Sequence, residues 1–146
     1  MFGYETDLDQ LAVATALIVE DEIFVALDLE RILTDAGYAV AGIAADRETA
    51  LAAAGACEIA FVDINLRDGP TGPDIARELA CKHNVKVVFV TANPTQIGTP
   101  ANALGYIRKP FSETAILAAA AIAAGDAHRA AANDDFVLLS DDVSGG

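Results

Sequence analysis

The chain has 146 residues, 53% of them hydrophobic, so we expect one domain with a packed core. Its formal net charge of −13 argues against direct binding to nucleic acid, which needs a basic surface. No apolar run reaches the roughly 20 residues that cross a bilayer, and the acidic start "MFGYETDLDQ" is unlike a signal peptide, so we expect a cytoplasmic protein that does not bind membranes.

Short apolar runs alternate with segments of helical periodicity along the chain. The expected strands are 15–19, 38–44, 58–62, 85–90 and a short one around Tyr106 and Ile107, and the expected helices are 22–37, 46–55, 72–83 and 112–132. This alternation predicts an α/β fold, in which a parallel sheet carries helices on both faces. Asp46 is expected to cap the second helix and Ser112 the last one.

The two ends of the chain are expected to lie outside the folded domain. Residues 1–13 are interpreted as a leader with one helical turn, residues 14–125 as the domain, and residues 126–146 as an extension with an acidic tail. The run "DDFVLLSDD" in this extension is interpreted as a solvated tail with a weakly docked apolar patch. The alternative is a linear segment that binds a partner.

The two cysteines, Cys57 and Cys81, lie far apart in the sequence. Neither has a His or Cys nearby at the spacing of metal ligands. We therefore expect free buried thiols and no zinc site.

Polar side chains follow four of the five expected strands, at the point where each strand ends. Glu20 and Asp21 follow the first strand and Asp63 the third, while Thr91 ends the fourth and Lys109 follows the fifth. A single Asp at the end of a strand needs no functional explanation, since Asp often starts a turn or caps the next helix. Four strand ends with these residue types are hard to explain as caps. In parallel α/β sheets the functional site lies beyond the carboxyl ends of the strands.

The residue types at this edge are chemically coherent. Two carboxylates about 5 Å apart repel each other by roughly 3 kcal/mol at an effective dielectric constant of 20. A hard cation such as Mg²⁺ relieves this repulsion, because it prefers carboxylate and water oxygens. Lys109 adds a second positive charge, and the Thr91 hydroxyl can donate a hydrogen bond. The set could hold a phosphoryl group against a carboxylate nucleophile.

The motifs "VEDE", "FVDINL", "FVTAN" and "GYIRKPF" stand at these strand ends. With them, residues 15–125 resemble a receiver domain of the two-component response regulators, of the single-domain, chemotaxis-regulator-like kind. The resemblance implies a flavodoxin-like sheet of five parallel strands in the order 2-1-3-4-5. We interpret the chain as a stand-alone receiver, because the residues after the expected domain, 126–146, are too few and too acidic to form a DNA-binding output domain.

The resemblance assigns a role to each residue of the site. Asp63 would accept the phosphoryl group, and Lys109 and Thr91 would contact it. Glu20, Asp21, Asp63 and the backbone carbonyl of Asn65 would hold Mg²⁺. Thr91 and Tyr106 would form the switch, and Pro110 would follow a cis peptide bond.

The function implied is that of a phosphoacceptor and not of an enzyme in the usual sense. A histidine kinase or histidine phosphotransferase would donate the phosphoryl group to Asp63 in a Mg²⁺-dependent reaction. The domain would assist both this transfer and the later hydrolysis. It would signal through protein partners or act as a phosphate sink, and its downstream target stays open.

The sequence departs from the family between Thr91 and Lys109, where it is about one helical turn shorter than usual. This segment carries Pro94, Gly98 and Pro100, which are unfavourable inside a helix. We therefore expect a short or irregular fourth helix and a changed output surface.

Three other functions are weighed against this one. A phosphohydrolase of the haloacid dehalogenase type would carry a second Asp two positions after the nucleophile, where this chain has Asn65. A flavodoxin-like cofactor binder would have a Ser, Thr and Gly-rich first turn, unlike "VEDE". A pseudo-receiver that serves only as a scaffold would not need the complete set of acidic pair, Asp, Thr and Lys.

Overall fold

The computed structural model describes residues 14–126 and 133–139, so the expected leader at 1–13 lies outside the described residues. The strands are β1 (Thr15–Val19), β2 (Ala39–Ala44), β3 (Ile59–Val62), β4 (Lys86–Thr91), β5 (Gly105–Arg108) and β6 (Phe136–Leu138). The helices are α2 (Ile23–Asp35), α3 (Arg47–Ala52), α4 (Gly72–His83) and α5 (Glu113–Ala123), with the 3-10 turns η1 (Ala54–Ala56) and η2 (Pro94–Gln96).

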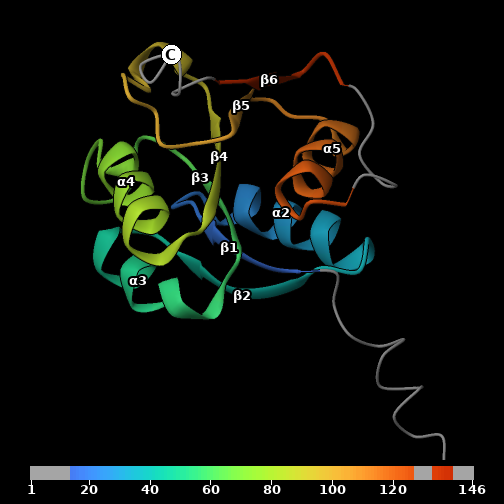
Figure 1. The fold of residues 1–146 in the computed structure, drawn as a ribbon, viewed down its shortest axis with the longest axis horizontal. Coiled ribbons are helices and arrows are strands. Elements are labelled where there is room, and N and C mark those ends of the chain that lie inside the picture. Colours follow the sequence, from blue (N-terminus) through green and yellow to red (C-terminus); the bar gives the residue numbers. More distant parts are fainter. Residues whose placement is uncertain (1–13, 127–132, 140–146) are drawn as a thin grey trace, which may run out of the picture.

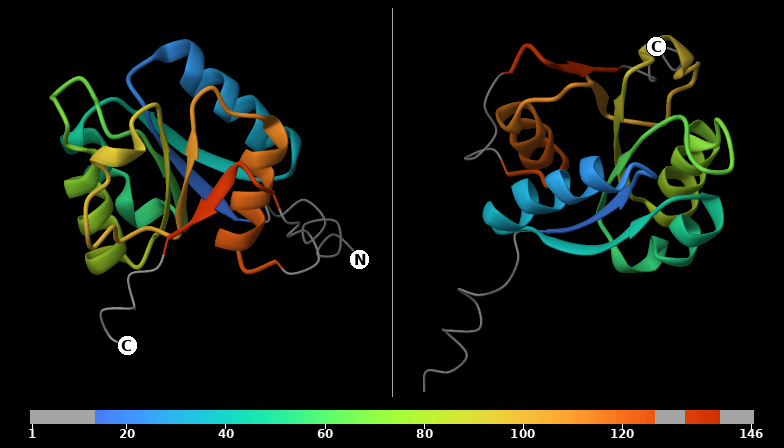
Figure 2. Two further views of the ribbon diagram at one scale, coloured as in Figure 1. Left: turned by 90° about the horizontal axis from the view of Figure 1, so that it is seen from above. Right: turned by 180° about the vertical axis from the view of Figure 1, so that it is seen from behind.

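The strands form one sheet in the order β2-β1-β3-β4-β5-β6 (Figure 1). The first five are parallel, and β6 pairs antiparallel with β5. Helices α2 and α5 cover one face of the sheet, and α3 and α4 cover the other (Figures 1 and 2). The expected fold class, the two helical layers and the order of the five parallel strands are confirmed. The sixth strand was not expected.

The side chains of the five parallel strands alternate between two apolar clusters, one on each face of the sheet. In β1, Ala16 and Ile18 belong to the cluster under α2 and α5, whereas Leu17 and Val19 belong to the cluster under α3 and α4. All four side chains are fully buried. The strands therefore read as continuous apolar runs, as a sheet covered on both faces requires.

Both predicted helix caps are present. The Asp46 side chain accepts a hydrogen bond from the backbone N–H of Thr49, and Ser112 accepts one from the N–H of Ala115. Helix α5 ends earlier than the sequence predicts, because Gly125 adopts a positive φ of 73° just after it. The rest of the expected helix, residues 127–132, lies outside the described residues.

Between β4 and β5 the only helical structure is the three-residue turn η2, so the prediction of a shortened fourth helix is confirmed. Ile97 and Ala101 nevertheless bury their side chains against the α3 and α4 side of the core. The segment is therefore packed as an irregular loop.

The run that was expected to be a solvated tail with a weakly docked apolar patch is docked more regularly than this at residues 136–138. These residues form β6, and the Phe136 side chain is 7% exposed and packs with the α2 and α5 cluster. The backbone of β6 pairs with β5 from Ile107 to Gly105. A strand of three residues gives almost no periodicity, so tertiary pairing and not local pattern creates it.

Cys57 and Cys81 are free thiols, as expected, but the expected burial holds only in part. Cys57 is half-buried, whereas Cys81 lies on the solvent side of α4 and is exposed. Within the described ranges, no helix is long and apolar enough to cross a membrane.

We predict that Phe136→Ala lowers the free energy of unfolding by about 3 kcal/mol, the usual cost of removing a buried aromatic ring. Leu138→Ala is the matched control, because its side chain is 64% exposed, and it should change stability by less than about 0.5 kcal/mol. Urea unfolding of both variants measures the difference. Equal, small losses would show that β6 contributes nothing to the stability of the domain.

Candidate functional site

The polar residues that follow the strands meet at one edge of the sheet, as predicted. The strand ladder continues one step beyond β3 and β5, because the N–H of Asp63 donates to Val19 O (2.9 Å) and the N–H of Lys109 donates to Thr91 O (3.0 Å). These bonds hold Asp63 beside the end of β1 and Lys109 beside the end of β4. The positions of Asp63 and Lys109 therefore follow from the sheet and not from a flexible loop.

Lys109 connects the acidic residues of this edge. Its Nζ lies 2.7 Å from Glu20 Oε1, 2.9 Å from Asp63 Oδ2 and 3.5 Å from Glu22 Oε1. The other Asp63 oxygen, Oδ1, accepts a hydrogen bond from the N–H of Ile64 at 2.7 Å. Asp63 is 8% exposed, so its carboxylate is held from both sides in a nearly closed position.

Burial and the ion pairs act in opposite directions on the charged groups. Burial raises the pKa of the Glu20 carboxyl, and the hydrogen bond to Lys109 offsets this only in part. Burial also lowers the pKa of Lys109, but its hydrogen bonds to Glu20 and Asp63 outweigh the effect and leave that pKa above its usual value. The surroundings thus favour the charged form of Lys109, whereas burial disfavours the charged form of Glu20.

The acidic residues fit a divalent cation. Glu20, Asp21 and Asp63 each present a carboxylate oxygen, and these oxygens lie within 4.8 Å of one another. Glu20 Oε1 is buried, and among the described atoms its one charged partner is Lys109 Nζ at 2.7 Å. One ammonium does not balance three carboxylates, and an oxygen-binding cation such as Mg²⁺ suits the remainder. Asp21 is exposed, which leaves an open side for water or a ligand.

The other predicted residues lie around this cluster. Thr91 is fully buried, and its Oγ1 accepts a hydrogen bond from the N–H of Asn93 at 2.9 Å. Asn65 lies in the loop after Asp63, and its side-chain amide donates to Gln96 of η2 at 3.0 Å. Tyr106 is half-buried on the α3 and α4 side of the sheet.

Thr91 and Tyr106 share one side of the sheet. Thr91 pairs with Arg108 and Phe89 with Tyr106 in the ladder between β4 and β5. Because side chains alternate along a strand, residues two apart point to the same side. The two residues assigned to the switch are therefore neighbours across the ladder, although no hydrogen bond between them is present.

The loop that follows Asp63 is fastened to the end of β2 by two reciprocal contacts. The Arg67 side chain forms an ion pair with Asp46, and the N–H of Arg47 donates to Asp68 Oδ2 at 3.0 Å. The N–H of Arg67 also donates to Ala45 O at 3.1 Å. Sequence analysis missed these ties, since nothing in the separate segments shows that they lie side by side.

Gly72, the first residue of α4, is a second feature that sequence analysis missed. A Cβ at this position would lie 2.2 Å from the backbone oxygen of Asp63 and 2.6 Å from the Cα of Ile64. Only glycine lets the start of α4 pack directly on the backbone of Asp63. A glycine at a helix start can mark such a close approach, but the pattern does not say to which residue.

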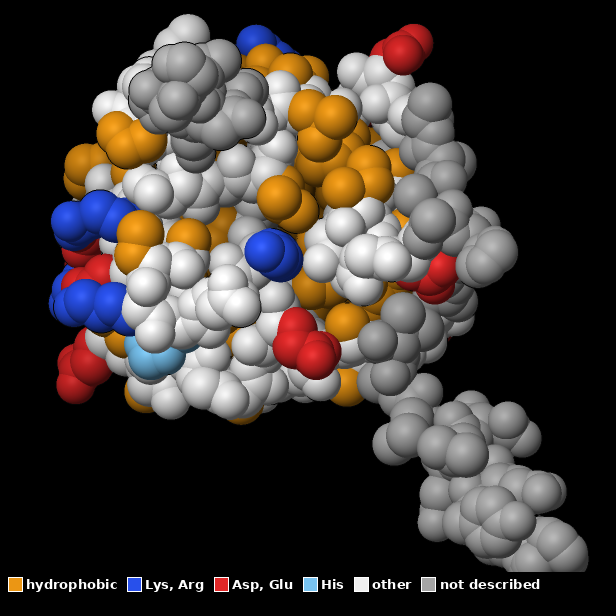
Figure 3. Space-filling model, in the orientation of Figure 1, with side chains coloured by type: hydrophobic (Ala, Val, Ile, Leu, Met, Phe, Trp, Pro, Cys, Tyr) orange, Lys and Arg blue, Asp and Glu red, His pale blue; other side chains and the backbone are white. Residues whose placement is uncertain are grey.

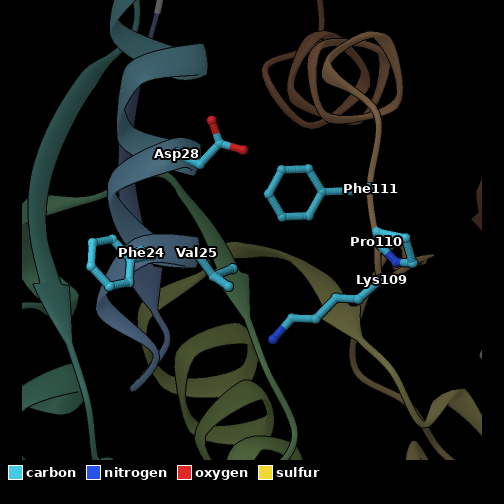
Figure 4. Close-up of a pocket in the computed structure, with 6 residues that line it drawn as sticks. All are labelled: Phe24, Val25, Asp28, Lys109, Pro110 and Phe111. Atoms are coloured by element: carbon cyan, nitrogen blue, oxygen red, sulfur yellow. The ribbon is translucent and has the colours of Figure 1, made fainter.

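A pocket of about 450 Å³ opens beside the cluster, between α2 and the chain after β5. Figure 4 shows Phe111 facing α2 and Lys109 extending from the same stretch of chain. Lys109 thus lines this pocket and also binds Glu20 and Asp63. Phe24, on the first turn of α2, is 85% exposed. The Lys109–Pro110 peptide bond is cis, as the resemblance implied.

Comparison with known proteins gives consistent matches. The family model described as "Response regulator receiver domain" matches residues 16–121. The chain is 35% identical over 100 residues to the phyllosphere-induced regulator PhyR of Methylorubrum extorquens, which covers 65% of this chain and 38% of PhyR. It is 32% identical over 131 residues to the transcriptional regulatory protein PdtaR of Mycobacterium tuberculosis, which covers 84% of this chain and 62% of PdtaR. The chain thus spans less than two thirds of either relative.

Among solved structures, the receiver domain of Erythrobacter litoralis PhyR superposes with a TM-score of 0.69 at 29% identity. The match covers 77% of this chain and 90% of that domain. The similarity therefore extends over almost the entire receiver fold.

We predict that Gly72→Ala destabilises the protein by about 1–3 kcal/mol, because the new methyl group forces α4 away from Asp63. Gly55→Ala is the control, since a Cβ there meets nothing within 4 Å. Urea unfolding compares the two variants. A Gly72→Ala protein as stable as Gly55→Ala would contradict the proposed close packing.

Proposed function

Because the chain belongs to the response regulator receiver domain family, we propose that Asp63 accepts a phosphoryl group from the phosphohistidine of a histidine kinase or histidine phosphotransferase. The observation that carries this proposal is the Lys109 ammonium, held between the buried carboxylates of Glu20 and Asp63. The phosphorylated protein then signals through a partner protein.

The two Asp63 oxygens have different roles in the proposed transfer. Oδ1 accepts a hydrogen bond from the backbone N–H of Ile64, and Oδ2 accepts one from Lys109. We assign the attack on phosphorus to Oδ2, because the Lys109 side chain can move from it to a phosphoryl oxygen, whereas the backbone N–H stays in place. The bond between phosphorus and the donor imidazole nitrogen breaks as the bond to Oδ2 forms, and the imidazole leaves. Water later attacks the same phosphorus and releases inorganic phosphate, which restores the carboxylate.

Lys109, and Mg²⁺ held by Glu20 and Asp21, would neutralise the negative charge that develops in this reaction. Lys109 binds Asp63 Oδ2 before transfer and moves to a phosphoryl oxygen afterwards, so it neutralises developing charge throughout. Glu20, Asp21, Asp63 and the backbone carbonyl of Asn65 would hold Mg²⁺, which supplies charge neutralisation when bound. The Thr91 hydroxyl turns to the phosphoryl group, and Tyr106 moves inward toward it.

A hydrolase with an Asp general acid fits the site less well. The residue two positions after Asp63 is Asn65, whose amide is engaged with Gln96. An amide cannot donate and recover a proton as a carboxyl group does.

We predict that a small phosphodonor with Mg²⁺ labels the wild-type protein once, on Asp63, and does not label Asp63→Asn. The substitution keeps the shape of the side chain and removes the nucleophile. Intact-protein mass spectrometry measures the added phosphoryl mass. Equal labelling of both proteins would refute the assignment of Asp63.

We also predict that Mg²⁺ raises the melting temperature of the wild type but not of Asp21→Ala. Without Mg²⁺, Asp21→Ala should be as stable as the wild type or more stable by up to about 1 kcal/mol, because one repelling charge is gone. Glu48→Ala is the control, since Glu48 is exposed on α3 and is not one of the three carboxylates of the cluster. A normal Mg²⁺ response in Asp21→Ala would argue against its role as a ligand.

A further inference from the structure

Strand β6 occupies a place on β5 that is shaped to receive it. A Cβ on Gly105 would lie 2.3 Å from the backbone oxygen of Val137 and 2.6 Å from the Phe136 ring. The missing side chain therefore makes room for a neighbouring backbone and for an aromatic ring. A glycine in a strand weakens that strand, and it often marks a place where another backbone approaches closely. Here the backbone of Val137 and the ring of Phe136 take that place.

The attachment of β6 is specific but small. Tyr106 pairs with Val137 and Ile107 with Phe136, and the N–H of Leu139 donates to Leu104 O at 2.8 Å. Val137 is 39% exposed and Leu138 64% exposed, so Phe136 is the one fully anchored side chain of the strand. A short segment with few buried contacts opens more readily than the strands of the core.

A turn at residues 133–135, just before β6, is hydrogen-bonded to α5. The Asn133 side chain donates to Thr114 Oγ1 at 3.3 Å, and its Oδ1 accepts from the N–H of Asp135 at 2.8 Å. Residues 133–139 thus dock as one unit across β5 and the start of α5. Figure 3 shows apolar side chains gathered on the part of the surface where Figure 1 places β6 and α5.

The place of β6 is connected to the phosphorylation site through β5. Tyr106 lies directly opposite Val137, and Tyr106 and Leu139 pack against the same apolar cluster. The same strand leads within one residue into Lys109, which binds Asp63. Residues directly opposite in an antiparallel pair face the same side of the sheet, so an inward movement of Tyr106 would change the surroundings of Val137 in β6.

We propose that the edge of β5 is a binding site for an extended segment of a partner protein, which β6 fills until phosphorylation of Asp63 releases it. This inference rests on the proposed function, and it names the edge of β5 as the surface through which the phosphorylated protein binds its partner. The partner segment runs antiparallel to β5 and carries an aromatic side chain for the space beside Gly105. Main-chain hydrogen bonds supply affinity and the aromatic residue supplies specificity, as in other strand-addition complexes.

A labelled peptide with the sequence of residues 133–139, NDDFVLL, tests this site in the full chain by fluorescence anisotropy. In the wild type the tethered β6 outcompetes the peptide, because its effective concentration is high. In Phe136→Ala the tethered strand is weakened, so the peptide should bind about tenfold or more tightly. The variant Gly105→Ala with Phe136→Ala should lose this binding, because the new methyl group fills the site. The peptide NDDAVLL is the matched control.

Beryllofluoride with Mg²⁺ tests the release. It should increase the affinity of the wild type for the peptide and speed hydrogen exchange at the Leu139 amide, while ¹⁹F NMR reports independently that beryllofluoride is bound. The exchange measurement needs no substitution, so it stands even if Phe136→Ala does not fold.

The outcomes separate the two proposals. If the peptide fails to bind Phe136→Ala, or binds the double variant equally well, the strand site is refuted. If beryllofluoride binds without changing peptide affinity or Leu139 exchange, release is refuted and the proposed function stands. If beryllofluoride does not bind, the proposed function and the release both fail, while the peptide result still decides the site.

Discussion

The ammonium group of Lys109 is the contact on which the carboxyl edge of the sheet depends. It follows β5 and reaches Glu20, which follows β1, and Asp63, which follows β3. Three strands therefore place their ends around one positive charge. Removing carboxylates from water is costly, and a buried ion pair seldom repays that cost in stability alone. The arrangement makes better sense as a site kept ready for an incoming anion and a cation than as a structural clamp.

The surroundings of this site differ from side to side. Toward α3 and α4, reciprocal contacts of Arg47 and Arg67 fasten the loop after Asp63, and Gly72 lets α4 rest on its backbone. Toward β4 and β5, the turn η2 replaces a helix and is tied to the site by Asn65 and Gln96 and by Thr91 and Asn93. The first side is held by ion pairs and backbone packing, and the second by two hydrogen bonds and an irregular loop without a helix.

The sequence predicted those features that depend on local pattern. Apolar runs ending in Glu20, Asp63, Thr91 and Lys109 determine both the sheet and the edge where they meet, because parallel strands share one carboxyl edge. Pro94 and Gly98 predicted the missing helix for the same local reason. Strand β6 escaped prediction, since its pairing joins Phe136 to Ile107 over a long stretch of chain. The roles of Gly72 and Gly105 could not be predicted either. Each glycine makes room for a backbone that is distant in the sequence, and the sequence does not show which backbone that is.

The antiparallel sixth strand also bears on how the folded protein behaves in a crowded solution. A parallel sheet that ended at β5 would present unpaired backbone groups beside Gly105, and such open edges invite pairing between molecules. Strand β6 covers that edge with a strand of only three residues, preceded by the exposed carboxylates of Asp134 and Asp135. Short length and adjacent charge are two of the devices by which natural sheets discourage aggregation. The segment that covers the edge of the sheet thus also protects the protein against aggregation through that edge.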